Sequence, residues 1–200
     1  MQAGLYGRIA VTYFEWAGTV RDETVVAWQV IDGAESAESF AAKLEARPAN
    51  TWRGTSISGA LRFGSRLFDN EFEGMRRVID ISGDGPNNIG TPVIPERDAA
   101  VAAGIVINGL PILIRPSQSF AELDRYYAEC VTGGPGSFVL PIRKSSEFAT
   151  AIRRKLILEV SGTLDAAPPV PAQATPVMDC ERGQRNRRLF SDPYFPQLDR

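Results

Sequence analysis

Short apolar runs alternate with longer segments of helical periodicity over residues 7–160. The runs are rich in Val, Ile and aromatic residues and end at Gly, Pro or polar residues, which is typical of buried strands. They predict strands at residues 7–18, 23–31, 76–82, 105–114 and 136–142. The connection GTVRD between the first two runs is short enough for an antiparallel hairpin.

The segments between these runs carry apolar residues at helical spacing. In residues 55–70, Ile57 and Leu61 share one helix face, and Thr55 or Ser56 stands where a cap is expected. The same reasoning predicts helices at residues 36–47, 55–70, 95–105, 119–131 and 145–160. Alternating strands and helices predict an α/β domain whose mostly parallel sheet is covered on both faces, with the early hairpin adding one antiparallel edge strand.

This pattern fails after the last predicted helix. Residues 165–177 are rich in Ala and Pro, as linkers are. The residues that follow are polar, basic and aromatic; they fit either a docked tail or a disordered one, and their composition favours disorder. We therefore expect one domain over residues 1–162, followed by a flexible linker and tail over residues 163–200.

Composition narrows the classes of partner. The chain of 200 residues is 44% hydrophobic and 23% charged, the balance of an ordinary globular protein. Its formal net charge of -2 gives no global basic field, so we expect no nucleic-acid partner. No apolar run reaches the roughly 18 residues of a membrane-spanning helix. The first residues also lack the successive regions of a signal peptide.

The residue types available for chemistry are few. The sequence has no histidine, which removes the Ser-His-Asp and Cys-His types of catalysis and histidine metal ligands. Cys130 and Cys180 are far apart and form no metal-binding motif. They are either a disulfide or two unrelated thiols, and we favour unrelated thiols.

The stretch VIDISGDGPNN, residues 78–88, ends a predicted strand in an acidic loop. Its acids are spaced like the start of an EF-hand, but Thr91 stands at the twelfth position, where a bidentate Glu belongs, and a strand precedes the loop. The loop has neither GxxxxGK[ST] nor GxGxxG, and no Lys follows, so it does not match a phosphate cradle. A hard-metal site is the third interpretation, because Mg²⁺ takes oxygen ligands and keeps several waters.

Several oxygen-bearing side chains suit that third interpretation. Asp84 follows a parallel strand, and ligands bind beyond the carboxyl ends of such strands. Thr55, Ser56 and Ser58 offer hydroxyls at the start of a predicted helix. The structural alternatives are a turn at Asp84 and helix caps at Thr55 and Ser56, and spacing alone favours them.

Five motifs occur in order along residues 3–160: GRIAVTYFEWAG, RGTSISGAL, RRVIDISGDGPNN, INGLPI and VTGGPGSFV. Together they resemble a bacterial von Willebrand factor A-like (vWA) family known as DUF1194. The resemblance implies a Rossmann-like three-layer αβα sandwich. It also implies a metal-ion-dependent adhesion site (MIDAS), in which a divalent ion, usually Mg²⁺, binds at the top of the sheet.

The resemblance assigns two ligands of that site. Three loops supply ligands in the family pattern; the second maps to Thr55 and the third to Asp84. Further rim residues are Ser56, Ser58, Ser82 and Asn87. The first loop, Asp-x-Ser-x-Ser, is not in this sequence. We therefore expect a chain truncated at its N-terminus, and weak or absent binding of Mg²⁺, Mn²⁺ or Ca²⁺.

The truncation also bears on the sheet. It implies that the family's first strand and helix are missing, and that strand is the central one. Its two neighbours then lose a hydrogen-bonding partner, which is costly for buried backbone groups. We expect that the remaining strands close the gap, that another segment or chain fills it, or that the fold is marginal.

The resemblance favours a non-enzymatic binding module that captures an acidic group of a protein partner through the ion. A second hypothesis is a metal-assisted hydrolase using Asp84 and Asp80, although an Asp within a strand more often hydrogen-bonds its neighbours. A third is a metal-free remnant without independent activity. The resemblance implies export of the full-length form to the periplasm or cell envelope, whereas this chain, without a signal peptide, is expected in the cytoplasm.

Overall fold

The computed structural model describes residues 2–3, 8–48, 52–114, 120–147, 150, 153 and 178–191. Its strands are β1 (Gln2–Ala3), β2 (Ile9–Tyr13), β3 (Val26–Ile31), β4 (Arg76–Gly83) and β5 (Ile105–Pro111). Its α-helices are α1 (Ala34–Glu45), α2 (Ile57–Arg66), α3 (Val93–Ala102), α4 (Leu123–Tyr126) and α6 (Arg182–Ser191). A π-helix over Tyr127–Val131 continues α4, and 3₁₀ turns span Asp22–Thr24 and Ser145–Glu147.

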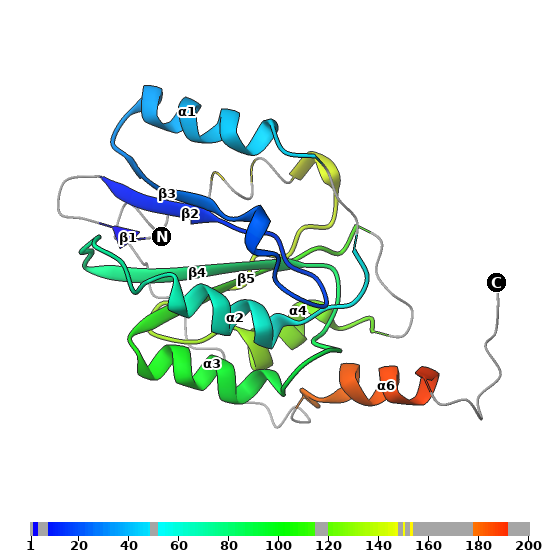
Figure 1. Ribbon diagram of the computed structural model, residues 1–200. Helices are drawn as coiled ribbons and strands as arrows, with labels where there is room; N and C mark the ends of the chain where they lie inside the picture. The colour runs from blue at the N-terminus through cyan, green and yellow to red at the C-terminus, as the bar shows by residue number, and fades with distance from the viewer. Residues whose placement is uncertain are drawn as a thin grey trace.

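The strands form one sheet in the order β3-β2-β1-β4-β5 (Figure 1). Strands β4 and β5 are parallel and pair over residues 77–83 and 105–111. Strands β2 and β3 form the predicted antiparallel hairpin, with β3 at the edge of the sheet. Because β1 is antiparallel to both of its neighbours, β2 runs in the same direction as β4 and β5. The α/β sandwich with an antiparallel edge strand is confirmed.

Strand β1 is the part of the sheet that the sequence pattern does not predict. It pairs with residues 9–10 of β2 on one side and with residues 76–77 of β4 on the other. It therefore stands between the hairpin and the parallel strands, where we expected a central strand to be missing. A segment of the same chain occupies this position over the two residues Gln2–Ala3.

Helices α2 and α3 pack against β4, β5 and each other, while α1 lies along β3 (Figure 1). The π-helix packs on β5 and α3. The core includes Ile57, Leu61, Ile79, Ile81, Ile107, Tyr126, Tyr127 and Val131. Burial of these apolar side chains supplies the main stabilisation of the domain. It also fixes the start of α2 beside the carboxyl ends of β4 and β5.

Three predicted elements differ from the observed ones. The helix expected at residues 119–131 becomes the short α4 and the π-helix. The strand expected at residues 136–142 is present only as isolated bridges to β5 and its extension, at Val139 and Ile142. The helix expected at residues 145–160 begins as a 3₁₀ turn, and most of its remainder lies outside the described residues.

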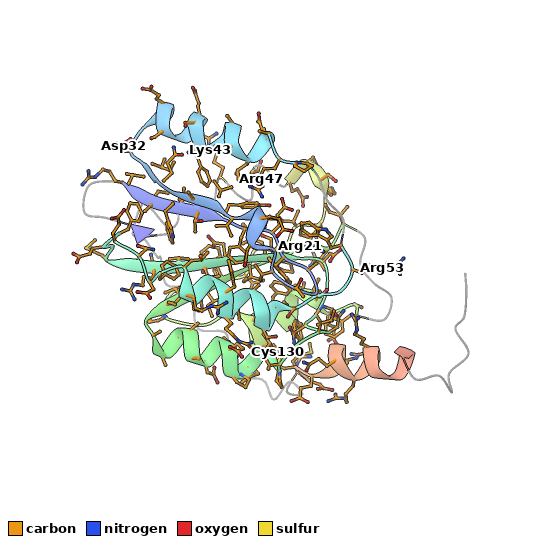
Figure 2. The ribbon with its side chains drawn as sticks, viewed as in Figure 1. Arg21, Asp32, Lys43, Arg47, Arg53 and Cys130 are labelled. Atoms are coloured by element: carbon orange, nitrogen blue, oxygen red, sulfur yellow. A yellow bond between two sulfur atoms is a disulfide. The ribbon has the colours of Figure 1, made fainter. Side chains whose placement is uncertain are left out.

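Cys130 and Cys180 form a disulfide, so the expectation of unrelated thiols is wrong. Their Cα atoms lie 5.6 Å apart, although 50 residues separate them in the sequence. Cys130, labelled in Figure 2, belongs to the π-helix that packs on α3. The bond forms because the segment at Met178 returns to this helix and buries Met178 in the core, where it is 7% exposed.

The disulfide corrects part of the domain prediction. The flexible tail was expected to span residues 163–200, yet residues 178–191 are described and contain the helix α6. This helix lies at the end of the molecule where β4 and β5 finish (Figure 1). Residues 163–177 and 192–200 lie outside the described residues, so flexibility there stays a prediction.

Replacing both cysteines by Ser is expected to lower the free energy of unfolding. The bond closes a loop of 50 residues, and the chain-entropy estimate for such a loop is about 4 kcal/mol. Urea denaturation of the Cys130→Ser, Cys180→Ser variant measures the loss. Wild-type protein under a thiol reductant is the control and should lose the same amount. A variant that unfolds at the wild-type urea concentration would contradict a structural role for the bond.

Candidate functional site

The two predicted metal ligands lie on adjacent loops. Asp84 is exposed directly after β4, and Thr55 is half-buried shortly before α2. A Cβ atom built on Gly85 would lie only 3.2 Å from the Thr55 hydroxyl oxygen. The backbone of Thr55 is held by Asn88, whose N–H donates to the Thr55 carbonyl at 2.8 Å and whose Oδ1 accepts from the Thr55 N–H at 2.9 Å. The structure thus brings together residues far apart in sequence.

Three of the further rim residues hold the loops in place. Asn87 is 0% exposed, and its Oδ1 accepts from the Ser58 N–H at 3.1 Å and from the Ser58 hydroxyl at 3.3 Å. Its Nδ2 donates to the Thr91 carbonyl at 3.0 Å. The Ser56 hydroxyl accepts from the Gly59 N–H at 3.3 Å, which is the cap predicted from sequence. Ser56, Ser58 and Asn87 therefore form these hydrogen bonds within the loops and the start of α2.

The remaining rim residue, Ser82, is half-buried within β4 beside Leu110 of β5. It lies in the strand and not on the loop that carries Asp84. The surface of the rim is therefore formed by Thr55 and Asp84. Within the described part of the chain, neither the Thr55 hydroxyl nor the Asp84 carboxylate forms a hydrogen bond or ion pair.

A buried hydroxyl lies directly beneath this rim. Tyr127 is 0% exposed, and its Oη has no hydrogen-bond partner among the described residues. A Cβ atom built on Gly83 would lie 2.7 Å from this oxygen and 3.2 Å from the Trp16 ring. Burial raises the pKa of Tyr127, and the charges of Tyr126 and Asp84 raise it further. The neutral phenol is thus a donor placed next to the Asp84 loop.

The donor set fits a hard cation only as part of its coordination shell. A carboxylate and a hydroxyl oxygen are ligand types that Mg²⁺ and Ca²⁺ take. Because an unpaired buried hydroxyl is costly, Tyr127 is suited to donate to a carboxylate or to an ordered water there. Among the described residues there is no group of three or more His, Cys, Asp or Glu side chains that could hold a metal. Water or partner oxygens would supply the remaining ligands.

Asp80, the second acid of the hydrolase hypothesis, lies within the sheet. Its Oδ1 accepts from Asn108 Nδ2 at 3.2 Å. Asn108 is 1% exposed, and its Oδ1 accepts from the Phe138 N–H at 3.2 Å. Asp80 is therefore hydrogen-bonded within the sheet, to a side chain of β5, where the sequence predicts a backbone or helix partner.

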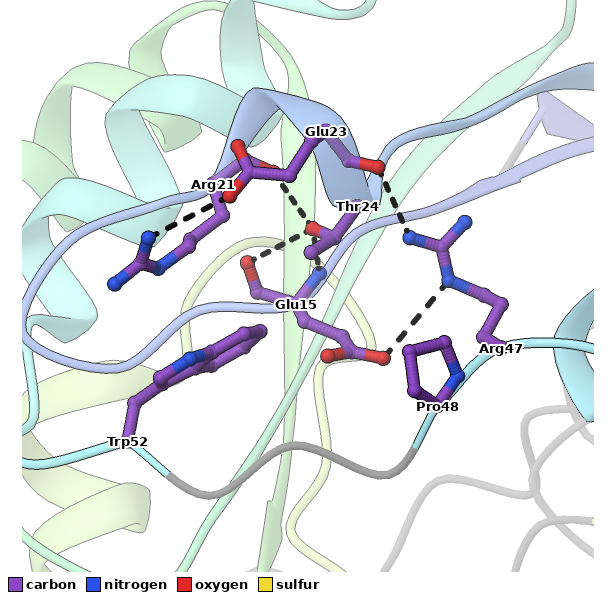
Figure 3. A pocket seen from close by; sticks show the side chains of 7 residues that line it. All are labelled: Glu15, Arg21, Glu23, Thr24, Arg47, Pro48 and Trp52. Atoms are coloured by element: carbon purple, nitrogen blue, oxygen red, sulfur yellow. Dashed lines mark hydrogen bonds and ion pairs between the residues drawn. The ribbon is translucent and has the colours of Figure 1, made fainter.

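A separate hollow of about 300 Å³ lies beside the β2–β3 hairpin and is not lined by Thr55 or Asp84 (Figure 3). Arg47 approaches Glu15 at 3.9 Å and donates to the Glu23 carbonyl at 3.3 Å. Arg21 lies over the Trp52 ring, 5.1 Å from its centroid. Arg47 and Glu15 face each other there, and the buried Arg47 Nε has no hydrogen-bond partner among the described residues.

Helix α6 supplies residues that the sequence did not single out. Gln184 Nε2 donates to the Gly90 carbonyl at 2.9 Å. A Cβ atom built on Gly183 would lie 2.5 Å from the Asn87 carbonyl oxygen, and one on Gly54 would lie 3.1 Å from Arg187 Nη1. The basic, polar composition of this segment predicted disorder, and only the unforeseen disulfide could have signalled its docking.

A mixed α/β sheet with the parallel pair β4–β5, helices packed against it and oxygen-bearing loops at the carboxyl ends of these strands define a von Willebrand factor A-like domain. The model of the family "Protein of unknown function (DUF1194)" matches residues 1–164, and the chain belongs to this family. No curated protein matches the chain.

Solved structures share the fold at low sequence identity. BatB, a conserved hypothetical protein from Bacteroides thetaiotaomicron, superposes with a TM-score of 0.53 at 18% identity over 77% of this chain and 80% of its own. An aerotolerance-related membrane protein from Bacteroides fragilis superposes with a TM-score of 0.50 at 20% identity, over 74% and 78%. The pilus adhesin SpaC from Lactobacillus rhamnosus GG gives 0.51 at 13% identity, over 78% and 24%. These likenesses show the fold alone.

The neighbouring residues Tyr126 and Tyr127 allow a matched test of whether the Tyr127 hydroxyl is unpaired. Tyr127→Phe is expected to leave the free energy of unfolding unchanged or raise it by up to about 1 kcal/mol, because the lost hydroxyl is unpaired. Tyr126→Phe is expected to lower it by about 1–2 kcal/mol, because that hydroxyl accepts from the Asn87 N–H and donates to the Cys180 carbonyl. Thermal and urea unfolding measure both. Equal losses in the two variants would contradict the assignment.

Proposed function

We propose that this vWA-like domain is a non-enzymatic binding module that uses a divalent ion at Thr55 and Asp84 to capture an acidic group of a protein partner. The observation that carries the proposal is that these two side chains lie on adjacent loops. Among the described residues, neither the Thr55 hydroxyl nor the Asp84 carboxylate forms a hydrogen bond. The unpartnered Tyr127 hydroxyl beneath them supports it.

Each residue has a definable part in such binding. When bound, the ion supplies positive charge and free coordination positions, which a carboxylate can fill. Asp84 is exposed, so its carboxylate and a partner can reach the same ion. The Thr55 backbone is held by the N–H and the Oδ1 of Asn88, so Thr55 needs little reorganisation to bind an ion. The start of α2, just after Thr55, adds a positive dipole end that favours an anionic partner.

The observations favour binding over hydrolysis. A hydrolase using two acids would need Asp80 and Asp84 to converge on one water or ion. The Asp80 carboxylate is instead hydrogen-bonded to Asn108 inside the sheet. Asp84 alone on an exposed loop suits a contact with a partner better than it suits general base catalysis, which requires a positioned acid or base near the substrate.

The disulfide favours an oxidising compartment over the cytoplasm, because structural disulfides persist outside reducing cellular spaces. Two structural neighbours, a pilus adhesin and an aerotolerance-related membrane protein, agree with a role at the cell envelope. Within the described residues, the helices are all too short or too polar to cross a membrane.

Titration with Mn²⁺, followed by the paramagnetic broadening of backbone amide signals, tests the ion site. Broadening should begin at Thr55 and Asp84. It should require at least about tenfold more Mn²⁺ in Asp84→Asn, because a neutral amide binds a hard cation more weakly than a carboxylate. Thr55→Val should weaken binding by a smaller factor.

Asp69→Asn is the matched control for this titration. Asp69 is also exposed, but it lies just beyond the other end of α2, so its loss should leave Mn²⁺ binding unchanged. The proposal fails if Asp84→Asn binds Mn²⁺ as the wild type does, or if the broadening starts away from the two loops.

A further inference from the structure

Helix α6 lies across both loops of the candidate site. Gly183 packs against Pro86 and Asn87, and Gln184 donates to the Gly90 carbonyl. Further along the helix, Arg187 reaches Gly54, the residue before Thr55. Figure 2 shows Arg53, which belongs to the same loop, at the end of the molecule where α6 lies. The helix thus forms a third side of the site, next to the Thr55 and Asp84 loops.

The disulfide holds this helix in place through a short chain of contacts. The Tyr126 hydroxyl accepts from the Asn87 N–H at 3.2 Å and donates to the Cys180 carbonyl at 3.3 Å. The Met178 N–H donates to Glu129 Oε2 at 2.9 Å, and the Met178 side chain is buried. The covalent bond and these contacts fix the start of α6 relative to the site.

Three of the four arginines of α6 differ in what they contact. Arg185 forms an ion pair with Asp179. Arg182 lies over the Phe120 ring, 5.4 Å from its centroid. Arg187 is exposed and forms no ion pair within the described residues, although its guanidinium lies beside Gly54. Of these three cations, Arg187 is the one available to an incoming anion at the rim.

Gly54 keeps this approach open. Its φ of +87° lies in the left-handed region, which other residues adopt only with strain. A Cβ atom there would lie 2.2 Å from Ile89 Cδ1 and 3.1 Å from Arg187 Nη1. A larger residue would therefore clash with Ile89 and crowd the guanidinium beside the Thr55 loop.

We propose that α6, held in place by the disulfide, forms a positively charged side of the site, and that Arg187 binds the acidic segment of the protein partner beside Thr55. This inference rests on the proposed function for the identity of the surface. It adds a residue that recognises the partner without the ion. A guanidinium binds carboxylates through charge-assisted hydrogen bonds, so an acidic peptide is the fitting partner chemistry. The disulfide matters because it sets where the guanidinium lies.

An acetylated, amidated tri-glutamate peptide in buffer containing EDTA is the probe, and backbone amide shifts report where it binds. In the wild type the shifts should centre on residues 54–55 and 187. Arg187→Gln should raise the dissociation constant about fivefold or more, because a charge-assisted contact is lost. Arg185→Gln, on the same helix and with the same change of charge, should stay within about twofold.

Gly183→Ala tests the position of the helix without altering its charge or the disulfide. The added Cβ would lie 2.5 Å from the Asn87 carbonyl oxygen, so α6 must move away from the loop. Alanine also has a higher helix propensity than glycine, so the helix itself is retained. Peptide binding should weaken by about threefold or more, because Arg187 is displaced.

The proposed role of Arg187 is overturned if Arg187→Gln binds the peptide like the wild type, or if Arg185→Gln weakens peptide binding equally. It is also overturned if no shifts occur at residues 54–55 in the wild type. These failures are distinguishable from failure of the ion site. If Asp84→Asn loses Mn²⁺ binding but Arg187→Gln binds the peptide like the wild type, only the proposed role of Arg187 is rejected. Peptide binding through Arg187 without Mn²⁺ binding rejects only the ion site.

Discussion

The side chain of Asn87 is fully buried between the loop after β4 and the start of α2. It accepts two hydrogen bonds from Ser58 and donates one to Thr91, while its backbone N–H donates to Tyr126. Because the side-chain amide of Asn87 forms the hydrogen bonds to Ser58 and Thr91, substituting Asn87 would leave buried polar groups unpaired. The position of Asp84 relative to Thr55 depends on this contact, because each residue lies only three positions from a partner in it.

The same contact links the site to the distant end of the chain. Tyr126, which accepts from Asn87, also donates to Cys180, and α6 then returns across the Asn87 carbonyl at Gly183. The disulfide therefore does more than restrict the unfolded chain, because it holds α6 next to the loops of the candidate site. A domain with a small sheet joined by the two-residue strand β1 gains rigidity from this closure at the end that carries the candidate site.

Local signals predicted much of the fold. The β2–β3 hairpin followed from two apolar runs joined by a short turn, and the Ser56 cap followed from its place before an apolar helix face. Strand β4 and the acidic loop after it were recognised in the same way, and the family resemblance then paired Asp84 with Thr55. These features depend on residues close together in sequence, or on motifs that keep their order.

The features that were missed depend on contacts between distant segments. Nothing near Cys130 or Cys180 indicates that they meet, and a basic segment such as α6 gives no sign that it is anchored by Met178. The unpaired hydroxyl of Tyr127 could not be told from an ordinary core tyrosine. The pairing of β1 with two strands was equally invisible, since two residues carry no periodicity.

Anomalous diffraction from crystals grown with Mn²⁺ tests the ion site most directly. The account predicts a peak in contact with an Asp84 carboxylate oxygen and the Thr55 hydroxyl, at about 2.1–2.5 Å from each, the range of hard-cation bonds to oxygen. A peak held by other residues, or an empty rim at Mn²⁺ concentrations that saturate the solution titration, would contradict it.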